Sequence, residues 1–492
     1  MEYVSTRDAS LRFSAAHAIE QGLSRDGGLF LPKQLPELPS LERLADMTYQ
    51  QRAVTIMKLF LDEFTEEELA AYAKKAYGPD KFDHDAVAPV VPLHGDTHVL
   101  ELWHGPTCAF KDMALQMLPH LLTASMKKNG EDKTVCILVA TSGDTGKAAL
   151  EGFCDVEHTK ILVFYPKDGV SDIQQLQMVT QSGENVGVCA VVGNFDDAQS
   201  GVKKIFSDAA YREELLKKGY VLSSANSINW GRVLPQIVYY ISAYCDLLAN
   251  GSIQNGEKVN FCVPTGNFGN ILACYYAKKM GLPVGKLICA SNANNVLTDF
   301  IETGVYDRNR PFYTTASPSM DILISSNLER LLYDLTGSDT EVRAYMQELA
   351  EKGRYQVSSS VAAKIKEHFV SGCCNDEETL KTIKAVYDDH DYLMDTHTAV
   401  AYAVLQDYQK QTGDRTTSVV VSTASPFKFC DSVLTALGVD EQKQGVAILD
   451  QLCTVSGRPA PGPLAKLAGK AVRFTQVTEK ENMTDVVTGV LN

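Results

Sequence analysis

Short apolar segments alternate with amphipathic stretches along most of this chain. From about residue 133, seven apolar runs rich in β-branched residues are separated by stretches whose apolar positions recur at helical spacing. Parallel strands buried on both faces read as continuous apolar runs, and helices connect them. The pattern predicts an α/β fold with doubly wound, mainly parallel sheets, whose strands are residues 135–141, 161–166, 186–192, 220–225, 259–264, 286–290 and 418–424.

Two parts of the chain depart from this alternation. Residues 40–76 are helical and charged, and residues near 327–394 are again mostly helical. We therefore expect three units. These are a mostly helical N-terminal domain over 1–95, an α/β domain over 96–260, and a second α/β domain over 261–492 that contains the helical insertion.

Charge and cysteine usage narrow the function classes. The formal charge of −15 argues against a nucleic-acid or anionic-membrane partner, because both reward excess Lys and Arg. No stretch reaches the roughly 18 apolar residues of a membrane span, and the N-terminal residues lack an apolar leader. The twelve cysteines contain no C-x-x-C pair, so we expect no metal site, free thiols even at Cys373 and Cys374, and a cytoplasmic protein.

The stretch VCILVATSGDTGKAAL (135–150) runs from a strand through a glycine turn into a helix. A nucleotide-binding P-loop has four residues between its glycines and a hydroxyl after the lysine. Here only two residues separate Gly143 from Gly146, and Ala148 follows Lys147. The spacing excludes a P-loop, so we expect this turn to bind an anion other than a nucleotide phosphate. We expect Lys147 itself to be solvated.

The stretch HVLELWHGPTCAFKDMALQ (98–116) predicts a strand, a turn and a helix that begins near Phe110 or Lys111. A helix N-terminus and an apolar neighbour both favour the neutral form of a lysine amine. A neutral amine is what Schiff-base chemistry with an aldehyde requires. A solvated surface lysine is the alternative that the local pattern leaves open.

A second glycine loop, VPTGNFGN (263–270), follows a predicted strand and precedes an apolar helix. Successive backbone N–H groups at such a helix N-terminus bind phosphate well. A simple tight turn between strand and helix is the alternative.

The segment HGPTCAFKDMALQ resembles HGPT-x-AFKD-x-ALQ of the threonine synthases, which are pyridoxal-phosphate enzymes of the tryptophan-synthase-β fold type, also called fold type II. The resemblance covers nearly the whole chain and the longer form of the family, which has an extra N-terminal domain. The other matching segments, in the family's order, are QGLSRDGGLFLP (21–32), ATSGDTG (140–146), SSANSINWGR (223–232), VPTGNFGNILACYYAKKMGLP (263–283), SPSMDILISSNLERLLY (317–333) and DTHTAVAYA (395–403).

The resemblance implies roles for cofactor-binding residues. Lys111 would carry pyridoxal 5'-phosphate as a Schiff base and act as general base and acid. Thr423 would face the pyridine nitrogen of the cofactor. The cofactor phosphate would be held, mostly through backbone N–H groups, by Gly266, Asn267, Phe268, Gly269 and Asn270.

The resemblance also implies a substrate site. Ser142, Gly143, Asp144 and Thr145 would bind the amino-acid part of the substrate, although Asp144 at a helix start is equally readable as an N-cap. A phosphate on the substrate favours an arginine. Arg232 is the first candidate, near Asn226 and Ser227, with Lys428 the weaker one and a structural Arg232 the alternative.

The implied reaction converts O-phospho-L-homoserine and water to L-threonine and phosphate, in a monomer or homodimer. Two alternatives remain: another fold-type-II lyase, similar to threonine or serine dehydratases, and a catalytically silent homologue that only binds a phosphorylated metabolite. The chain departs from the family pattern at Ser425, where His is common, and at Thr396, where Pro is common.

Overall fold

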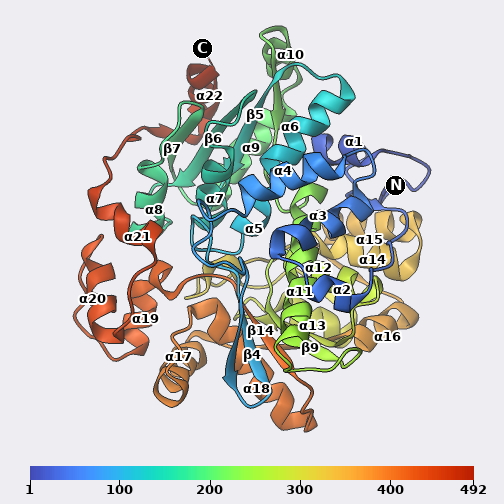
Figure 1. Cartoon of the computed structure of the whole chain (residues 1–492). Helices are drawn as coiled ribbons and strands as arrows, with labels where there is room; N and C mark the ends of the chain where they lie inside the picture. Colours follow the sequence, from blue (N-terminus) through green and yellow to red (C-terminus); the bar gives the residue numbers. More distant parts are fainter. Residues whose placement is uncertain (492) are drawn as a thin grey trace.

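The computed structural model describes residues 1–491, and two sheets form its framework (Figure 1). The smaller sheet is parallel throughout, with the strand order β15-β7-β6-β5-β8. Helices flank it on both faces, as expected for a doubly wound sheet (Figure 1). Its strands are β5 (Thr134–Ala140), β6 (Thr159–Pro166), β7 (Val186–Val192), β8 (Tyr220–Ser223) and β15 (Val477–Glu479).

The larger sheet has six strands in the order β13-β10-β9-β14-β4-β3, and only the edge strand β3 runs antiparallel to its neighbour. Its strands are β3 (Val90–His94), β4 (Thr97–Glu101), β9 (Val259–Pro264), β10 (Val284–Ser291), β13 (Phe369–Cys373) and β14 (Ser418–Ser422). All seven strands predicted from apolar runs are present, and each lies in one of the two main sheets.

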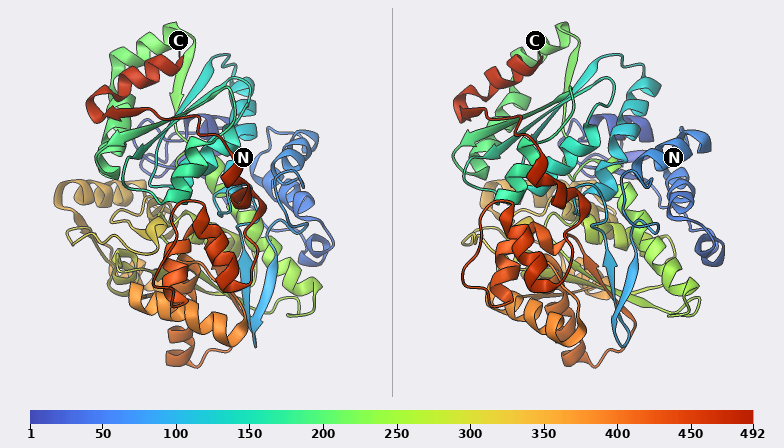
Figure 2. Two further views of the ribbon diagram at one scale, coloured as in Figure 1. Left: turned by 90° about the vertical axis from the view of Figure 1, so that its left-hand side faces the viewer. Right: turned by 60° about the vertical axis from the view of Figure 1, so that its left-hand side comes forward.

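The sequence suggested a boundary between the two α/β domains at residue 260, but the two sheets do not divide the chain there. Strand β4 belongs to the larger sheet, because it pairs in parallel with β14 through the register Thr97 to Ser418. In the other direction, β15 returns to the smaller sheet, and α22 (Met483–Leu491) packs beside it. Figure 2 shows this late segment running from the lower part of the molecule back to the upper one.

The N-terminal part is mostly helical, as predicted. It contains the antiparallel pair β1 (Tyr3–Ser5) and β2 (Phe30–Pro32). Thr48 and Thr65 begin two of its helices with capping boxes, each satisfying N–H groups that have no acceptor within the helix. The helices are α1 (Ala15–Gln21), α2 (Leu41–Ala45), α3 (Tyr49–Phe60) and α4 (Glu66–Ala76).

One long buried helix, α11 (Trp230–Ala249), joins the N-terminal part to the rest of the molecule. It packs against α2 and α3 on one side and against α12 (Gly269–Lys279) and α5 (Asp112–Leu115) on others. At its start the buried Trp230 ring contacts Tyr3 and Phe60, with ring centroids 5.7 Å apart in both pairs. The first turn of α11 is therefore rigidly packed, and it carries Arg232.

The remaining helices cover the sheets or form the insertion, which also contains the pair β11 (Val305–Asp307) and β12 (Arg354–Gln356). They are α6 (Leu118–Asn129), α7 (Asp144–Phe153), α8 (Asp172–Val179), α9 (Phe195–Ser207), α10 (Ala209–Lys217), α13 (Val296–Thr303), η1 (Pro318–Met320), α14 (Leu328–Thr336), α15 (Asp339–Lys352), α16 (Ser359–His368), α17 (Asp376–His390), α18 (Thr396–Thr412), η2 (Pro426–Lys428), α19 (Cys430–Ala436), α20 (Ala447–Ser456), α21 (Gly462–Ala465), η3 (Lys466–Gly469) and η4 (Lys480–Asn482).

Two general features bear on the sequence-based expectations. Within residues 1–491, no helix combines the length and the apolar character needed to cross a membrane. The twelve cysteines are free thiols, including Cys373 and Cys374.

Gly152 in α7 tests the packing that supports the short helix α5. A Cβ atom at Gly152 would lie 2.0 Å from the carbonyl oxygen of Leu115, which belongs to α5. We expect Gly152→Ala to destabilise the protein by roughly 1–3 kcal/mol, because neither backbone yields easily. The measurement is the urea midpoint of unfolding. Gly489→Ala in α22 is the matched control, since no heavy atom lies within 4 Å and alanine favours helix. Equal midpoints for the two variants would contradict the expectation.

Candidate active site

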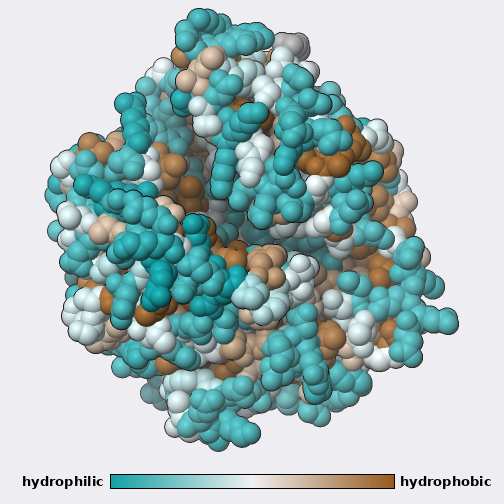
Figure 3. All heavy atoms as spheres, turned by 180° about the vertical axis from the view of Figure 1, so that it is seen from behind, coloured by the Kyte–Doolittle hydropathy of each residue, from teal (hydrophilic) through white to brown (hydrophobic). Residues whose placement is uncertain are grey.

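The predicted site residues lie where strands of the two sheets end. Residues 142–145 follow β5, residues 226–232 follow β8, residues 266–270 follow β9, and Thr423 follows β14. In parallel α/β sheets the carboxyl ends of the strands are where ligands bind. The molecule is hollowed near the centre of the face shown in Figure 3, with hydrophilic side chains around most of the opening.

The turn before Lys111 is tied to both its own helix and the larger sheet. The N–H of Phe110 donates to the carbonyl of Thr423 at 2.8 Å. Asp112, which is buried, accepts from the N–H of Thr107 at 2.8 Å and from its hydroxyl at 2.7 Å. Burial raises the pKa of Asp112 to about 6, and the two hydrogen bonds oppose that rise. The sequence predicted a helix start near Phe110 or Lys111; the helix begins at Asp112, with Lys111 at its N-cap position.

The amine of Lys111 is largely withdrawn from solvent, with only 12% of the side chain exposed. It lies 3.4 Å from the hydroxyl of Ser319 and 4.0 Å from a carboxylate oxygen of Asp144. Burial lowers its pKa to about 8; Asp144 opposes this, and the cations Arg232 and Lys428 add to it. The surface-lysine alternative is therefore excluded.

Asp144 sits between two lysines. One of its oxygens accepts from the Nζ of Lys428 at 3.0 Å and from the Nε2 of Gln174 at 2.9 Å, and the other faces Lys111. Burial acts to raise the pKa of Asp144, but Lys428 and Lys111 hold it well below its ordinary value. The N-cap interpretation is wrong, because Gly143 occupies that position and no side chain caps the helix.

The structure places both Lys428 and Lys147 differently from the sequence-based expectation, which made Lys428 a candidate phosphate ligand and Lys147 a solvated side chain. The Nζ of Lys428 donates to Asp144, to the carbonyl of Thr107 at 2.8 Å and to Gln177 at 2.9 Å. These contacts use its three N–H groups, so it acts on the site through Asp144 rather than as a free phosphate ligand. Lys147 is buried rather than solvated, and it contacts Glu151 at 3.1 Å and also Gln181.

The second glycine loop reverses the chain tightly before α12. Phe268 adopts a left-handed conformation with φ 62° and is buried, and Gly269 begins the helix. The first N–H groups of a helix have no acceptor within it, so they remain available to an anion. The Oδ1 of Asn270 accepts from the buried hydroxyls of Tyr239 and Tyr240. Its Nδ2 is buried and has no hydrogen-bond partner, so Asn270 offers a side-chain donor as well as its backbone N–H.

Asn327, which the sequence analysis did not single out, joins two of the predicted segments. Its Nδ2 donates to the carbonyl of Asn267 at 3.1 Å and to the carbonyl of Ser227 at 3.2 Å. Arg330, which is completely buried, donates to the carbonyl of Ile228 at 2.6 Å. The glycine loop and the segment before α11 are thus held side by side.

Arg232 is a buried cation without a matching carboxylate. Its guanidinium donates to the carbonyl of Ala225 at 2.5 Å, while its Nε is buried and has no hydrogen-bond partner. Burial lowers its pKa to about 10, and within residues 1–491 no carboxylate forms an ion pair with it. A buried, unpaired guanidinium is costly unless an anion joins it. Of the neighbouring candidates, Ser142 and Asn226 are exposed and Thr145 is half-buried.

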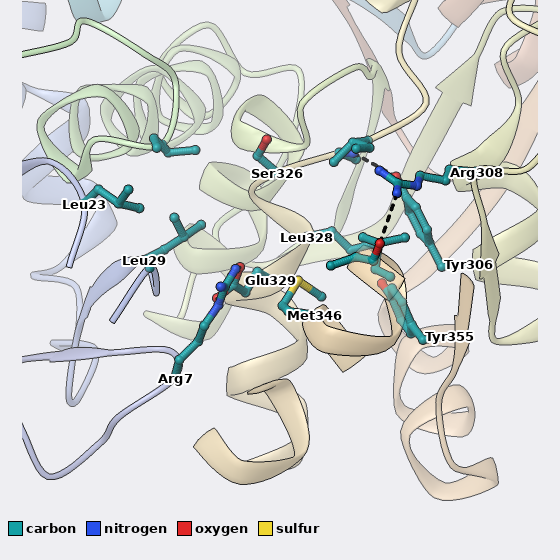
Figure 4. A pocket seen from close by; sticks show the side chains of 16 residues that line it. Arg7, Leu23, Leu29, Tyr306, Arg308, Ser326, Leu328, Glu329, Met346 and Tyr355 are labelled. Atoms are coloured by element: carbon teal, nitrogen blue, oxygen red, sulfur yellow. Dashed lines mark hydrogen bonds and ion pairs between the residues drawn. The ribbon is translucent and has the colours of Figure 1, made fainter. Parts of the chain in front are cut away.

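A separate cavity of about 350 Å³ lies between the N-terminal part and the helical insertion (Figure 4). Leu29, Leu328, Met346 and Tyr355 line it, and Arg7 pairs with Glu329 at its edge. None of the predicted site residues borders it. The two regions meet at Ser325, which lines the cavity and donates its hydroxyl to the carbonyl of Gly266 at 2.7 Å.

Comparison with known proteins identifies the family. Residues 2–77 match the model described as threonine synthase N terminus, residues 86–366 match pyridoxal-phosphate dependent enzyme, and residues 398–487 match threonine synthase, C-terminal. The threonine synthase of Saccharomyces cerevisiae is 38% identical over 466 residues, which is 88% of this chain and 89% of that protein. The chain belongs to the threonine synthase family.

Two further similarities agree with this assignment. The crystal structure of pyridoxal-phosphate-bound threonine synthase from Brucella melitensis covers all of both chains, with 37% identity and a TM-score of 0.89. The fold is therefore the expected fold type II of pyridoxal-phosphate enzymes. The human protein threonine synthase-like 1 is 41% identical over 461 residues, which is 89% of this chain but 61% of the human protein. The chain thus spans about three fifths of that relative.

The departure from the family pattern at Ser425 has a structural explanation. Ser425 is buried, and its hydroxyl accepts from the N–H of Phe427 at 3.3 Å, which caps η2. Its own N–H donates to the carbonyl of Cys108 at 3.0 Å. Ser425 therefore shapes the turn that carries Lys428 and links it to the turn before Lys111.

The lowered pKa of Lys111 is directly measurable in cofactor-free protein. A short pulse of an acylating reagent, followed by peptide mapping, gives the reactivity of residue 111 at each pH. We expect a midpoint near pH 8, against about 10.4 for an ordinary lysine. Arg232→Gln moves the midpoint upward, because it removes a cation that favours the neutral amine.

The exposed Lys217 provides the internal reference for reagent activity in that measurement. A midpoint above pH 10 for Lys111 in the native protein would contradict the burial that the structure shows.

Proposed function

We propose that this chain is a threonine synthase that converts O-phospho-L-homoserine and water to L-threonine and phosphate. The observation that carries the proposal is the amine of Lys111, which is buried, has a pKa lowered to about 8, and has Asp144, Arg232 and Lys428 as its charged neighbours. An amine of this kind, beside groups that attract anions, suits aldehyde chemistry on a phosphorylated amino acid.

The residues present fit pyridoxal 5'-phosphate. A side chain at Gly266 would not fit, since a Cβ there would lie 2.7 Å from the carbonyl oxygen of Ser319. Gly266, Asn267, Phe268, Gly269 and Asn270 would hold the cofactor phosphate through the N–H groups at the start of α12. Thr423, which is buried at the end of β14, would face the ring nitrogen. When bound, the cofactor supplies an aldehyde and a ring that draws electrons from the substrate's α-carbon.

The substrate's two ends call for different residues. Ser142, Gly143, Asp144 and Thr145 would hold the amino-acid end at the start of α7. Arg232 would bind the substrate phosphate, because a dianion there provides the missing partner for its buried guanidinium. Asn226 and Ser227 would border the same phosphate.

Lys111 performs the proton transfers in this proposal. Its Nζ takes the proton from the substrate's α-carbon and later moves a proton at the β-carbon, and a lowered pKa keeps the amine competent as a base near neutral pH. Asp144, charged and 4.0 Å away, stabilises the amine whenever it holds that proton. Phosphate leaves from the γ-carbon, which takes up a proton to become the methyl group; water then adds at the β-carbon, and a proton returns to the α-carbon.

The proposed partners are small molecules only, in a monomer or homodimer. The twelve free thiols support a cytoplasmic location, where thiols stay reduced.

Turnover of O-phospho-L-homoserine tests the proposal. We expect purified protein reconstituted with pyridoxal phosphate to release phosphate and threonine in equal amounts. Lys111→Ala lowers both by a factor of roughly 10³ or more, because the general base is lost. Lys217→Ala, an exposed position on α10, is the matched control.

Each alternative gives a different result in that assay. A dehydratase would form a 2-oxo acid from threonine or serine. A silent homologue would bind the phosphorylated substrate without releasing phosphate. Either result would overturn the proposal.

Two glycine substitutions test the cofactor cradle. We expect Gly266→Ala to weaken pyridoxal phosphate binding about tenfold or more, because the new Cβ would displace the carbonyl of Ser319. Gly269→Ala has the smaller effect, since its nearest contact is the side-chain amide of Asn327 at 3.3 Å. Equilibrium dialysis of the cofactor measures both. Equal affinities in the two variants would argue against the predicted cradle.

A further inference from the structure

A buried aspartate–histidine pair lies behind the site, at the start of α18. The Nδ1 of His397 is 2.6 Å from a carboxylate oxygen of Asp395, and both residues are almost completely buried. Asp395 also caps α18 by accepting from the N–H groups of His397 and Thr398. The segment DTHTAVAYA contains this pair, but the cofactor and substrate roles proposed above leave both residues unused.

The hydrogen bonds of His397 define its tautomer. The N–H of Ser319 donates to its Nε2 at 3.1 Å, so Nε2 carries a lone pair. Nδ1 therefore carries the proton and donates it to Asp395. The two hydrogen bonds fix the direction of the His397 ring, and its Nε2 is aimed at the backbone of a residue 78 positions away.

Ser319 touches the two groups on which cofactor binding depends. Its hydroxyl accepts from the Nζ of Lys111 at 3.4 Å. Its carbonyl oxygen packs so closely on Gly266 that a Cβ there would lie 2.7 Å away. Ser319 belongs to η1, a single turn of three residues, which has little rigidity of its own. The bond to His397 anchors this turn to the larger structure.

We propose that His397, oriented by Asp395, is a positioning residue that fixes Ser319 between Lys111 and Gly266, the first glycine of the second glycine loop. The role rests on the proposed function of Lys111 and of that loop. Through the hydroxyl of Ser319, the pair sets the direction of the amine. Through the carbonyl of Ser319, which packs on Gly266, it sets the position of the second glycine loop. A pair that only capped α18 would affect neither.

Two substitutions of His397 separate these roles. Glutamine places an oxygen near the position of Nε2 and retains an acceptor for Ser319. Asparagine is shorter, reaches Asp395, and leaves the N–H of Ser319 without its acceptor. We expect His397→Asn to weaken pyridoxal phosphate binding about tenfold, and His397→Gln to stay within about threefold of the native protein.

Acylation of Lys111 in cofactor-free protein provides the second readout. Loss of the Ser319 hydroxyl removes a hydrogen bond that favours the ammonium form. We expect Ser319→Ala to speed the acylation of residue 111 at pH 7 by roughly two- to threefold. His397→Asn gives a similar increase, and the double variant gives no more than either alone, because the two residues act in series.

Thr398→Val is the control for a general loss of packing. The hydroxyl of Thr398 donates to Asp395 and lies 3.0 Å from the hydroxyl of Ser422, but Thr398 does not contact Ser319. We expect it to lower the urea midpoint and to leave the acylation of Lys111 unchanged. The proposal is overturned if Thr398→Val changes that rate as much as His397→Asn, if the effects of Ser319→Ala and His397→Asn add, or if glutamine is as damaging as asparagine. Because acylation needs no substrate, these outcomes are independent of whether phosphohomoserine is turned over.

Discussion

The buried ion pair between Asp144 and Lys428 is the interaction on which the rest of the site depends. Asp144 begins the helix after a strand of the smaller sheet, and Lys428 follows a strand of the larger one. Their contact at 3.0 Å therefore ties together the two halves that face each other across the crevice. Removing either partner would leave an uncompensated buried charge, which costs several kcal/mol.

The same pair determines the chemistry available to Lys111. Asp144 is the only carboxylate within ion-pair distance of Lys111 in residues 1–491, and it is already shared with Lys428. Arg232, Lys428 and Lys111 thus form a surplus of buried cations in a chain whose formal charge is −15. A local excess of positive charge inside an acidic protein concentrates the field where a phosphorylated ligand would sit. The amine relieves part of this repulsion by releasing its proton.

Local patterns predicted much of the fold, and the reasons for the failures are physical. Apolar runs such as residues 259–264 were predicted correctly because central parallel strands are buried on both faces. Strand β13 lies at the edge of the larger sheet, is only partly buried, and falls within a stretch of helical character. Lys147 is buried because Glu151, one helical turn later, provides a counter-charge. The segments holding Ser319, Asn327 and His397 were recognised, but contacts across 60 to 208 residues cannot be read from spacing.

The return of β15 and α22 to the smaller sheet has a consequence for folding during translation. Residues 134–223 supply four of the five strands, yet the apolar cluster around Phe164 and Val191 also includes Met483, Val486 and Val487. While the ribosome is still making the intervening residues, the edge of β7 that pairs with β15 has no neighbouring strand. The hydrophobic surface that α22 covers is then exposed to water. An open edge of this kind attracts other chains. The nascent protein is thus most in need of a chaperone after residues 134–223 have been synthesised and before α22 packs against the smaller sheet.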